Sequence, residues 1–386
     1  MNDKHRLYMR RRPDRPRLVA LILIGAALAV LGWLSAFGPS VEAQKPFGIQ
    51  FSDWGPGRAD LAVRTFAGTG SWETGGGNND GARLDAAFDI PTGIAFERDG
   101  SLLVADFNNH LVRKIGLDGE VSTLAGSGEA GWSDGPGKEA EFNGPAGLAV
   151  GPSGDVYVSD ALNHVIRRVN PDGSVETLAG GGSEGSANGK PQELRGFSNG
   201  RGSEARFDAP AGIVVDQAGT IFVADKNNNR IRRITPAGDV TTFAGSGAIA
   251  SVDGSGLGAS FAFPTGLAID GLGNLYVTEQ DSASVRKVDP SGNVSTVLRM
   301  HDGPSGLSGL AVDHEGNLYV GDVWTNQIRF INRNGEHSTY AGVAGVGFSD
   351  GPGDTAQFVN PTGIVVAASG ALFVADAGNH RIRVIE

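Results

Sequence analysis

Short apolar runs alternate with glycine-rich turns along almost the whole chain after residue 60. In one stretch, runs over 147–150, 156–159, 164–169 and 175–179 are separated by turns rich in Gly, Pro, Asp and Asn. Short runs with β-branched and aromatic residues, bounded by such turns, are typical of β-strands. The pattern therefore predicts a four-stranded antiparallel sheet in this stretch.

The same pattern occurs six times in the sequence. The copies begin at Pro91, Pro145, Pro210, Pro264, around Gly309 and at Pro361. A repeat of this length is typical of stacked supersecondary units that bury their apolar faces on one another. Because a single sheet would expose two apolar faces, we expect the six units to pack radially as the blades of a ring.

The two ends of the chain predict how the ring closes. The last copy stops after its third strand, at Ile385, whereas Val63–Gly68 has the sequence of a fourth strand such as Val121–Gly126. We expect the N-terminal strand to complete the last blade. The fold class predicted for residues 61–386 is thus an all-β, six-bladed β-propeller closed by an N-terminal strand.

The amino-acid sequence of the repeat resembles that of a known family. Asp160-Ala-Leu-Asn-His-Val-Ile-Arg167 and Asn109-His110-Leu111 are similar to the NHL repeat, which is named for its Asn-His-Leu signature. The resemblance covers all six units and implies the propeller fold. It implies little about activity, because the family includes protein-binding and RNA-binding propellers, sensor domains of membrane proteins, and relatives with lyase or lactonase activity.

The N-terminal segment predicts export of the propeller. Residues 1–17 are basic, residues 18–37 are uncharged and mostly apolar, and residues 38–60 form a linker. A run of about 20 apolar residues is long enough to cross a bilayer as a helix, and its basic flank predicts a cytoplasmic N-terminus. We expect a single-pass anchor in the cell membrane with an extracytoplasmic propeller. The alternative is a signal peptide cleaved after Ala43, which would release a secreted protein.

Charge and cysteine content exclude several partners. The first 17 residues hold seven of the 32 Lys and Arg residues and two of the 43 Asp and Glu residues, which leaves a net charge near −16 for the remainder. Such a surface is a poor match for nucleic acid, whose binding depends on clustered Lys and Arg. The absence of cysteine excludes thiolate metal sites. We expect a monomeric propeller.

An acid and an arginine recur in every unit. The acid ends the second strand, and the arginine follows seven residues later. The acids are Asp106, Asp160, Asp225, Glu279, Asp322 and Asp376; the arginines are Arg113, Arg167, Arg232, Arg286, Arg329 and Arg383. Since every blade needs them, we expect a structural role, with the acid accepting backbone N–H groups in its turn and pairing with an arginine between blades. A ring of acids binding cations near the axis is the alternative.

Histidine recurs at one position of the turn after the acid. His110, His164 and His380 share this position with Asn229. A position that accepts asparagine is unsuited to a catalytic base, so we expect these side chains to stabilise the turn by hydrogen bonding.

A longer motif lies between the blades. Asp134-Gly, followed by Ala140-Glu-Phe142, recurs in similar form from Asp80, Asn199, Asp253 and Asp350. We expect the Asp-Gly pair to form a turn and the Ala-x-Phe pair to fill an apolar gap above the interface between blades. By strand order these loops share a face with the Asn-His turns. We expect no cofactor; Ca²⁺ or another divalent ion at these loops is the alternative, although the ligand spacing of an EF-hand is absent.

The repetition breaks between the fourth and fifth blades. The long loop is missing between Val297 and Gly309. Side chains that could gather at the resulting notch are Glu279, Asp281, Arg299, His301, Asp302 and Trp324. Together they would offer a cation, an acid or base, carboxylates and a stacking surface. Two interpretations stay open: a degenerate repeat without a ligand, and a ligand-binding site.

These observations favour a non-enzymatic binding module. We expect an exported, membrane-tethered propeller that binds a protein, peptide or glycan through its loop-rich face. No catalytic residue is assigned, because phosphate loops, Gly-x-Ser-x-Gly and His-Glu-x-x-His motifs are absent from the sequence. The alternative is a propeller enzyme of the lyase or lactone-hydrolase type with a divalent metal near the channel. A third hypothesis is a structural envelope protein.

Overall fold

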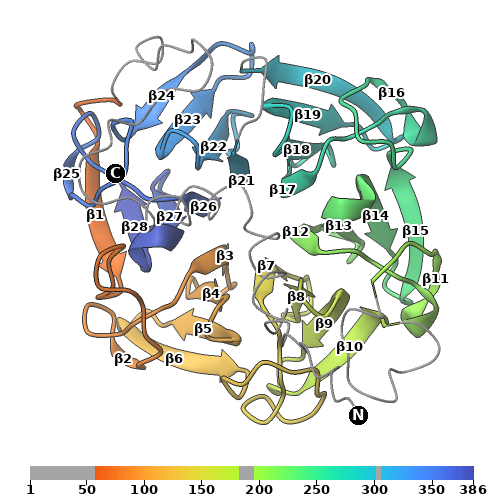
Figure 1. The fold of residues 1–386 in the computed structure, drawn as a ribbon, viewed down its shortest axis with the longest axis horizontal. Helices are drawn as coiled ribbons and strands as arrows, with labels where there is room; N and C mark the ends of the chain where they lie inside the picture. Colours follow the sequence, from red (N-terminus) through yellow and green to blue (C-terminus); the bar gives the residue numbers. More distant parts are fainter. Residues whose placement is uncertain (1–56, 182–194, 301–305) are drawn as a thin grey trace, which may run out of the picture. The chain divides into compact units, whose positions relative to one another are not determined.

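A computed structural model describes residues 57–181, 195–300 and 306–386, which all belong to the compact unit Gly48–Glu386. These residues form six antiparallel sheets around a central axis, one sheet for each sequence repeat (Figure 1). The hydrophobic helix expected over 18–37 lies outside the described residues. Among the residues that are described, no helix is long and apolar enough to cross a membrane.

Each blade is built from four strands, and in blades 1–5 these strands run in chain order from the axis outwards. Blade 1 holds β3 (Pro91–Phe96), β4 (Leu102–Asp106), β5 (Leu111–Ile115) and β6 (Glu120–Ala125); blade 2 holds β7 (Pro145–Val150), β8 (Val156–Asp160), β9 (Val165–Val169) and β10 (Val175–Gly180). Blade 3 holds β12 (Pro210–Val215), β13 (Ile221–Asp225), β14 (Arg230–Ile234) and β15 (Asp239–Ala244); blade 4 holds β17 (Pro264–Ile269), β18 (Leu275–Glu279), β19 (Ser284–Val288) and β20 (Asn293–Arg299). Blade 5 holds β21 (Leu307–Val312), β22 (Leu318–Asp322), β23 (Gln327–Ile331) and β24 (His337–Ala341). Blade 6 holds β26 (Pro361–Val366), β27 (Leu372–Asp376), β28 (Arg381–Ile385) and β1 (Ala62–Ala67).

Four blades carry an additional two-residue strand on their outer edge. These strands are β2 (Gly81–Ala82), β11 (Gly200–Arg201), β16 (Gly254–Ser255) and β25 (Gly351–Pro352), and each pairs with the outermost strand of its blade. In blade 2 a single bridge from Gly135 to Val175 takes this place. The connections also contain one-turn 3₁₀ helices, η3 (Gly202–Glu204), η4 (Lys226–Asn228), η5 (Gly256–Gly258) and η6 (Ala377–Asn379).

The ring closes as the sequence predicts. The N-terminal strand β1 pairs antiparallel with β28, with Val63 opposite Ile385 and Thr65 opposite Arg383. The last blade thereby obtains its outer strand from the start of the propeller, so the predicted closure is confirmed. Arg58 donates its backbone N–H to the carbonyl of Tyr340 at 3.0 Å, and the residues just before β1 therefore lie on blade 5.

The hydrophobic core consists of six clusters, one at each interface between neighbouring blades. We call these interfaces seams and name them by their blades. At seam 1/2, for example, Leu103 and Val112 of blade 1 pack with Val156 and Val158 of blade 2. Each of the other five clusters likewise combines apolar residues from two adjacent blades. Each sheet buries its two apolar faces on its two neighbours, as the repeat period predicts.

The innermost strands approach one another to backbone contact. Each contains a glycine at an equivalent position: Gly93, Gly147, Gly212, Gly266, Gly309 and Gly363. A Cβ atom at any of these glycines would lie 2.5 Å or less from a carbonyl oxygen of the next blade's innermost strand. Side chains are therefore sterically excluded here, and the six glycines set the small radius at the centre of the ring.

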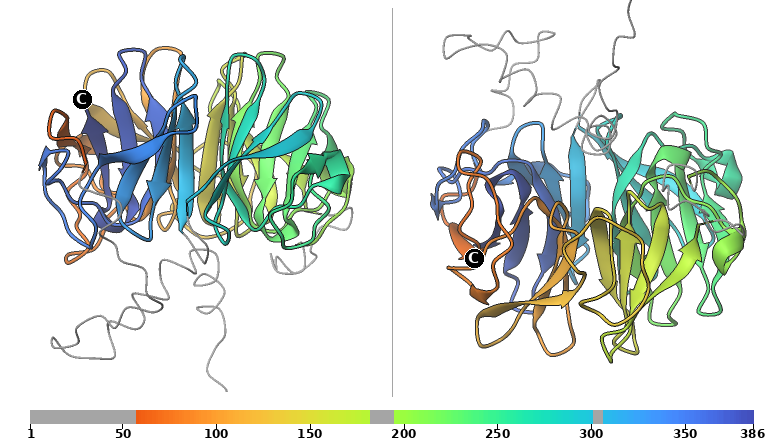
Figure 2. Two further views of the ribbon diagram at one scale, coloured as in Figure 1. Left: turned by 90° about the horizontal axis from the view of Figure 1, so that it is seen from above. Right: turned by 60° about the horizontal axis from the view of Figure 1, so that its bottom comes forward.

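The strand order gives the ring two different faces. The connections from the outermost strand of one blade to the next innermost strand all lie on one face, which we call the loop face; their described ranges are 68–90, 126–144, 195–209, 245–263 and 342–360. The short turns that join the first to the second and the third to the fourth strand lie on the opposite face (Figure 2). The loop face therefore carries the long connections between blades, and the opposite face carries short turns.

We expect Gly266→Ala to destabilise the protein by about 1–3 kcal/mol, the usual range for overpacking. Its Cβ would overlap the carbonyl oxygen of Ser308, which belongs to the neighbouring blade and cannot move alone. Gly271→Ala in the same blade is the matched control, because a Cβ there meets no atom within 4 Å. Urea unfolding measures both variants. Equal stabilities would contradict the close approach of the inner strands.

Candidate functional site

The acid that ends each second strand lies in the interior beneath the loop face. Asp160 is fully buried, and its Oδ1 accepts the backbone N–H of Asn143 at 2.7 Å. Its Oδ2 accepts hydrogen bonds from Asn163 Nδ2 at 2.8 Å and from Arg167 Nη1 at 3.0 Å. In blade 2 the backbone partner belongs to the connection that leads into the blade, not to the turn after the acid as expected. The carboxylate therefore ties this connection to the blade. In blade 5 the expectation is confirmed, because Asp322 accepts the backbone N–H groups of Trp324 and Thr325 in its own turn.

Arg167 extends the same network to the long loop. Its Nη1 also donates to the carbonyl of Glu141 at 2.7 Å, and its Nη2 donates to the carbonyl of Ser133 and to Asp134 Oδ1 at 2.8 and 2.7 Å. The ring of Phe142 lies 5.0 Å from the guanidinium carbon. A planar group with several donors suits such a set of acceptors. The buried arginine thus clamps residues 133–142 onto blade 2.

Four other blades repeat this clamp. Each arginine joins the buried acid of its blade to the polar residue that begins the Asp-Gly or Asn-Gly turn: Arg113 joins Asp106 and Asp80, Arg232 joins Asp225 and Asn199, Arg286 joins Glu279 and Asp253, and Arg383 joins Asp376 and Asp350. In blade 5, Arg329 contacts Asp322, Thr325 and Thr339. The arginine, and not the acid alone, connects the loop face to the sheets.

The loop carboxylates do not fit a cation site. Asp134 Oδ1 accepts hydrogen bonds from Arg167 and from Thr177 Oγ1, and its Oδ2 accepts the backbone N–H of Thr177 at 3.0 Å. A calcium ion needs several free oxygen ligands, and a guanidinium in contact with the carboxylate would repel it. In the part of the chain that the structure describes, no group of three or more His, Asp or Glu side chains could hold a metal ion. The Asp-Gly loops are therefore structural.

Burial changes the ionisation of the blade acids. It raises the pKa of Asp106, Asp160 and Asp225 to about 6, against the opposing effect of the arginine, asparagine and backbone donors. The carboxylates stay ionised at neutral pH, but their desolvation offsets much of the attraction within each ion pair. The network therefore fixes geometry more than it adds net stability.

The histidines form hydrogen bonds across the seams. The Nδ1 atoms of His110, His164 and His380 accept the backbone N–H of Gly144, Ala209 and Ile90 at 3.2, 3.0 and 3.2 Å. In each case the histidine belongs to one blade, and the N–H belongs to the residue at which the chain enters the next blade. The expectation of a hydrogen bond within the turn was wrong. We call this residue, immediately before the third strand, the latch position.

The latch position has a left-handed backbone in every blade. Its residues are His110, His164, Asn229, Ala283, Asn326 and His380, with φ between +50° and +58°. The third strand of blade 2 consequently starts at Val165, one residue after the predicted start. Asn229 and Asn326 also accept a backbone N–H across their seams, from Phe263 at 3.0 Å and Asn360 at 2.8 Å. Asn and His are enriched in this conformation among residues other than glycine, and both have a side-chain atom that can accept the N–H across the seam.

At seam 4/5 the latch position holds Ala283, whose side chain cannot accept an N–H. Ala283 is fully buried, and its carbonyl accepts the backbone N–H of Met300 at 2.9 Å within blade 4. Ala283, Met300 and Leu307 share one hydrophobic cluster. The break in the sequence pattern therefore coincides with a change from a polar to an apolar contact. This change is visible in the sequence, where alanine replaces histidine or asparagine at the latch position.

Glu279 is part of the scaffold and does not face a notch. It is fully buried and accepts hydrogen bonds from Arg286 Nη1 at 2.7 Å, from the Ala262 N–H at 3.2 Å, and from the hydroxyls of Ser282 at 2.5 Å and Ser251 at 2.6 Å. Serine at 282 replaces the asparagine of other blades. The longer acid is matched by a shorter neighbour, so blade 4 keeps the common network with different side chains.

Of the other residues proposed for the notch, the structure describes Asp281, Arg299 and Trp324. Asp281 and Arg299 are exposed, and Arg299 ends β20 opposite Ser284. Trp324 is half-buried, and its backbone N–H donates to Asp322 Oδ1 at 3.1 Å. The described contacts do not join Asp281, Arg299 and Trp324 into one site. His301 and Asp302 lie outside the described residues, so a ligand site at this junction stays a prediction.

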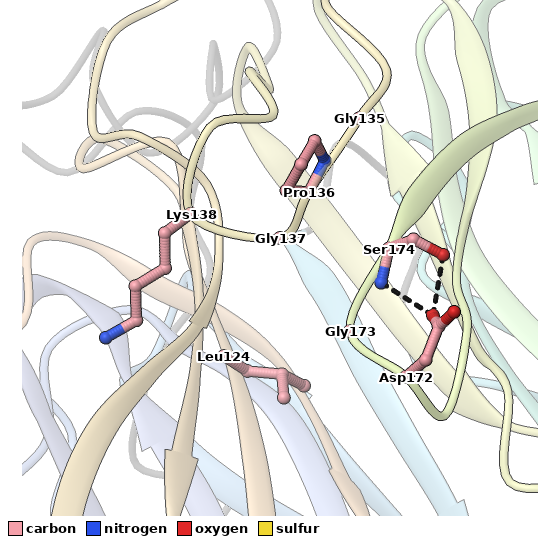
Figure 3. Close-up of a pocket in the computed structure, with 8 residues that line it drawn as sticks. All are labelled: Leu124, Gly135, Pro136, Gly137, Lys138, Asp172, Gly173 and Ser174. Carbon is pink, nitrogen blue, oxygen red and sulfur yellow. Dashed lines mark hydrogen bonds between the residues drawn. The ribbon is translucent and has the colours of Figure 1, made fainter.

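A shallow groove of about 530 Å³ lies between the outer strand of blade 1, the connection that follows it and a turn of blade 2. It is lined by Leu124, Gly135, Pro136, Gly137, Lys138, Asp172, Gly173 and Ser174 (Figure 3). Asp172 accepts the backbone N–H and hydroxyl of Ser174 at 2.9 and 2.6 Å, and Lys138 extends away from that pair. The groove is open and brings no cluster of chemically reactive groups together. Its acid, Asp172, already accepts two hydrogen bonds from Ser174.

Models of known protein families match three stretches of the repeated sequence. Residues 147–235 match the Teneurin NHL domain, and residues 88–115 and 358–385 match the NHL repeat. The fold defines the chain as a six-bladed β-propeller. NHL repeats are detected in blades 1 and 6, as the sequence of the repeat predicts, so the chain is a propeller that contains NHL repeats.

The relatives differ in size and in what they are named for. NHL repeat-containing protein 2 of Bos taurus is 27% identical over 343 residues, which cover 80% of this chain and 40% of that protein. The chain spans 27% and 40% of the lengths of the first two curated relatives. An auxiliary nutrient binding protein from Bacteroides thetaiotaomicron has a TM-score of 0.62 at 16% identity, covering 89% of this chain and 78% of that one. A gluconolactonase from Xanthomonas campestris has a TM-score of 0.55 at 14% identity, covering 90% and 97%. At these identities the two structures agree with the fold alone.

We expect Asn199→Asp to stabilise the protein by about 0.5–1.5 kcal/mol, the worth of one hydrogen bond. In blade 2 the corresponding Asp134 accepts the N–H of Thr177, whereas an amide nitrogen in Asn199 cannot accept the equivalent N–H of Thr242. The new charge would also face the buried Arg232. Urea unfolding is the measurement.

Asn334→Asp is the control for the added charge, because Asn334 is exposed in a turn on the opposite face. We expect it to change stability by less than about 0.5 kcal/mol. Equal effects of the two substitutions would contradict a specific role of the carboxylate in the clamp.

Proposed function

We propose that the chain is a non-enzymatic binding module that takes a protein, peptide or glycan partner on its loop face. The observation that carries this proposal is the combination of fixed loop bases with exposed apolar loop tips. A loop that is held in place before binding loses little conformational entropy when a partner arrives. Scaffolds with positioned loops commonly carry function on those loops.

The bases of the loops are held by the arginine clamps and the latches. In the loop before blade 4, for example, Arg286 binds Asp253, and Asn229 of blade 3 accepts the N–H of Phe263. Both contacts lie at least in part below the surface and use groups that are present in most blades. Binding at the tips would therefore not require the bases to rearrange.

The tips differ among the blades and expose large apolar side chains. Trp72, Phe197, Ile249 and Val346 are 45%, 43%, 61% and 45% exposed, and they come from four different loops of the loop face. Exposed aromatic and aliphatic groups on a rigid support are typical of sites for protein or peptide partners. Of the three classes of partner, the apolar tips favour protein or peptide over glycan.

The proposal includes location outside the cytoplasm. The basic residues 1–17 followed by the uncharged run 18–37 support a single-pass anchor with the propeller on the extracytoplasmic side. The net charge near −16 of the remaining chain argues against nucleic acid as partner. The alternative of a lyase or lactone hydrolase has no specific observation in its favour in the part of the chain that is described.

A triple variant of the loop tips tests the proposal. We expect Trp72→Ser, Ile249→Ser and Val346→Ser together to weaken capture of the partner at least about tenfold, because buried apolar anchors commonly contribute more than 1 kcal/mol each. Quantitative pull-down with the full-length chain, followed by mass spectrometry, compares the recovered proteins. Unchanged thermal unfolding of the variant shows that the fold is kept.

The control variant carries Leu117→Ser and Leu272→Ser, which change two side chains on the opposite face that are 76% and 82% exposed. A partner retained by the wild type and this control but lost from the tip variant supports the proposal. A partner lost equally from both variants, or from neither, contradicts binding through the loop face.

A further inference from the structure

Two of the histidine latches have a carboxylate beside the amide that they hold. At seam 6/1, His380 Nδ1 lies 3.2 Å from the backbone nitrogen of Ile90 and 3.2 Å from Asp89 Oδ1. At seam 2/3, His164 Nδ1 lies 3.0 Å from the backbone nitrogen of Ala209 and 3.7 Å from Asp208 Oδ1. The acid directly precedes the latched residue in both cases. A single ring nitrogen therefore faces one hydrogen-bond donor and one acceptor.

The protonation state of the histidine decides which of the two it can bind. A neutral imidazole whose Nδ1 carries a lone pair accepts the amide N–H, whereas an imidazolium has only donors. On protonation, Nδ1 takes a proton from solvent, the bond from the amide N–H is lost, and the new Nδ1–H points at the neighbouring carboxylate. We propose that seams 6/1 and 2/3 are proton-operated switches in which His380 and His164 exchange a backbone amide for Asp89 and Asp208.

The latched residues are under backbone strain. Ile90 and Ala209 have φ of +54° and +52°, in the left-handed region. This conformation is costly for residues with a Cβ, above all for a β-branched one such as Ile90. The latch helps to hold each residue there, at the point where the chain enters β3 or β12. Loss of the latch therefore permits relaxation at the inner ends of two loops of the loop face.

The surroundings of His164 set the direction of the effect at seam 2/3. Burial lowers the pKa of His164, while the charge of Asp208 raises it and that of Arg195 lowers it further. Asp208 also accepts a hydrogen bond from Asn227, and Asp89 accepts one from Asn108. Because the folded-state pKa of His164 lies below its unfolded value, its latch contributes stability above about pH 6.5 that is lost as the pH falls.

The other seams provide internal controls. At seam 1/2, His110 accepts the N–H of Gly144, but the residue before Gly144 is Asn143, which offers no carboxylate. Burial lowers the pKa of His110 against the charges of Glu129 and Asp89. At seams 3/4 and 5/6 the latches are Asn229 and Asn326, which do not titrate. Acid should therefore act on two of these five polar latches first.

Amide hydrogen exchange on the full-length chain tests the switch. Protection factors are measured at pH 7.5 and pH 5.5 and corrected for the intrinsic pH dependence of exchange. We expect the protection of Ile90 and Ala209 to fall about two- to tenfold at the lower pH, the equivalent of one hydrogen bond. The amides of Phe263 and Asn360, which asparagine holds, should keep their protection.

Two sets of variants separate the switch from general acid destabilisation. His164→Asn and His380→Asn should keep the latch, as Asn229 does, and abolish its pH dependence. Asp208→Asn, which copies Asn143, should move the transition at Ala209 to lower pH. Protection of Ile90 and Ala209 that does not change with pH, or that falls equally at Phe263 and Asn360, would overturn the proposal. A transition that Asp208→Asn leaves in place would overturn the exchange of partners.

Discussion

A buried arginine on the third strand of each blade is the contact on which the rest of the propeller depends. In blade 2 the guanidinium of Arg167 is fully buried and binds the blade acid Asp160, the loop acid Asp134 and two loop carbonyls. A charge placed in the interior is tolerated only when its hydrogen-bonding capacity is well used. The loop must therefore fold over the blade to satisfy it. In blade 2 one residue thus links the sheet to the loop face.

The seams impose the second constraint. Inner glycines let neighbouring backbones touch near the axis, apolar clusters fill the middle of each seam, and a latch joins the blades at the loop face. At five of the six seams the neighbouring blades thus contact each other at three levels. The polar latches lie closest to the surface on which we place binding. Protonation of a latch histidine can therefore alter the loop face while the apolar clusters of the seams stay unchanged.

The sequence was sufficient for the fold because internal repetition acts as its own alignment. Six copies set the blade number, and the displaced strand Val63–Gly68 set the closure. The pairing of Arg167 with Asp134 was not predicted, although both residues belong to motifs that were recognised. The loop motif precedes five of the six blades and the arginine occurs in all six, so spacing alone does not tell whether the loop acid meets the arginine of the blade before or after it.

The site was harder to predict because it depends on local compensation. Glu279 looked exceptional in sequence, yet the hydroxyls of Ser282 and Ser251 absorb its extra length and keep it buried. The latch partner of His164 lies 45 residues further along, at Ala209, beyond the reach of turn-based reasoning. What the sequence did indicate is that the repeated polar residues belong to the scaffold. The residues that differ between copies, at the loop tips, are where a specific partner would be recognised.

The most direct test of this account is the stability of Arg167→Met in the full-length chain, measured by urea unfolding at neutral pH. The account predicts a loss of about 3–5 kcal/mol, because the buried Asp160 would be left without its counter-charge. Arg168→Met is the control: Arg168 pairs with Glu176 near the surface, and its loss should cost less than about 1 kcal/mol. Equal, small losses in the two variants would contradict the central role of the buried arginine.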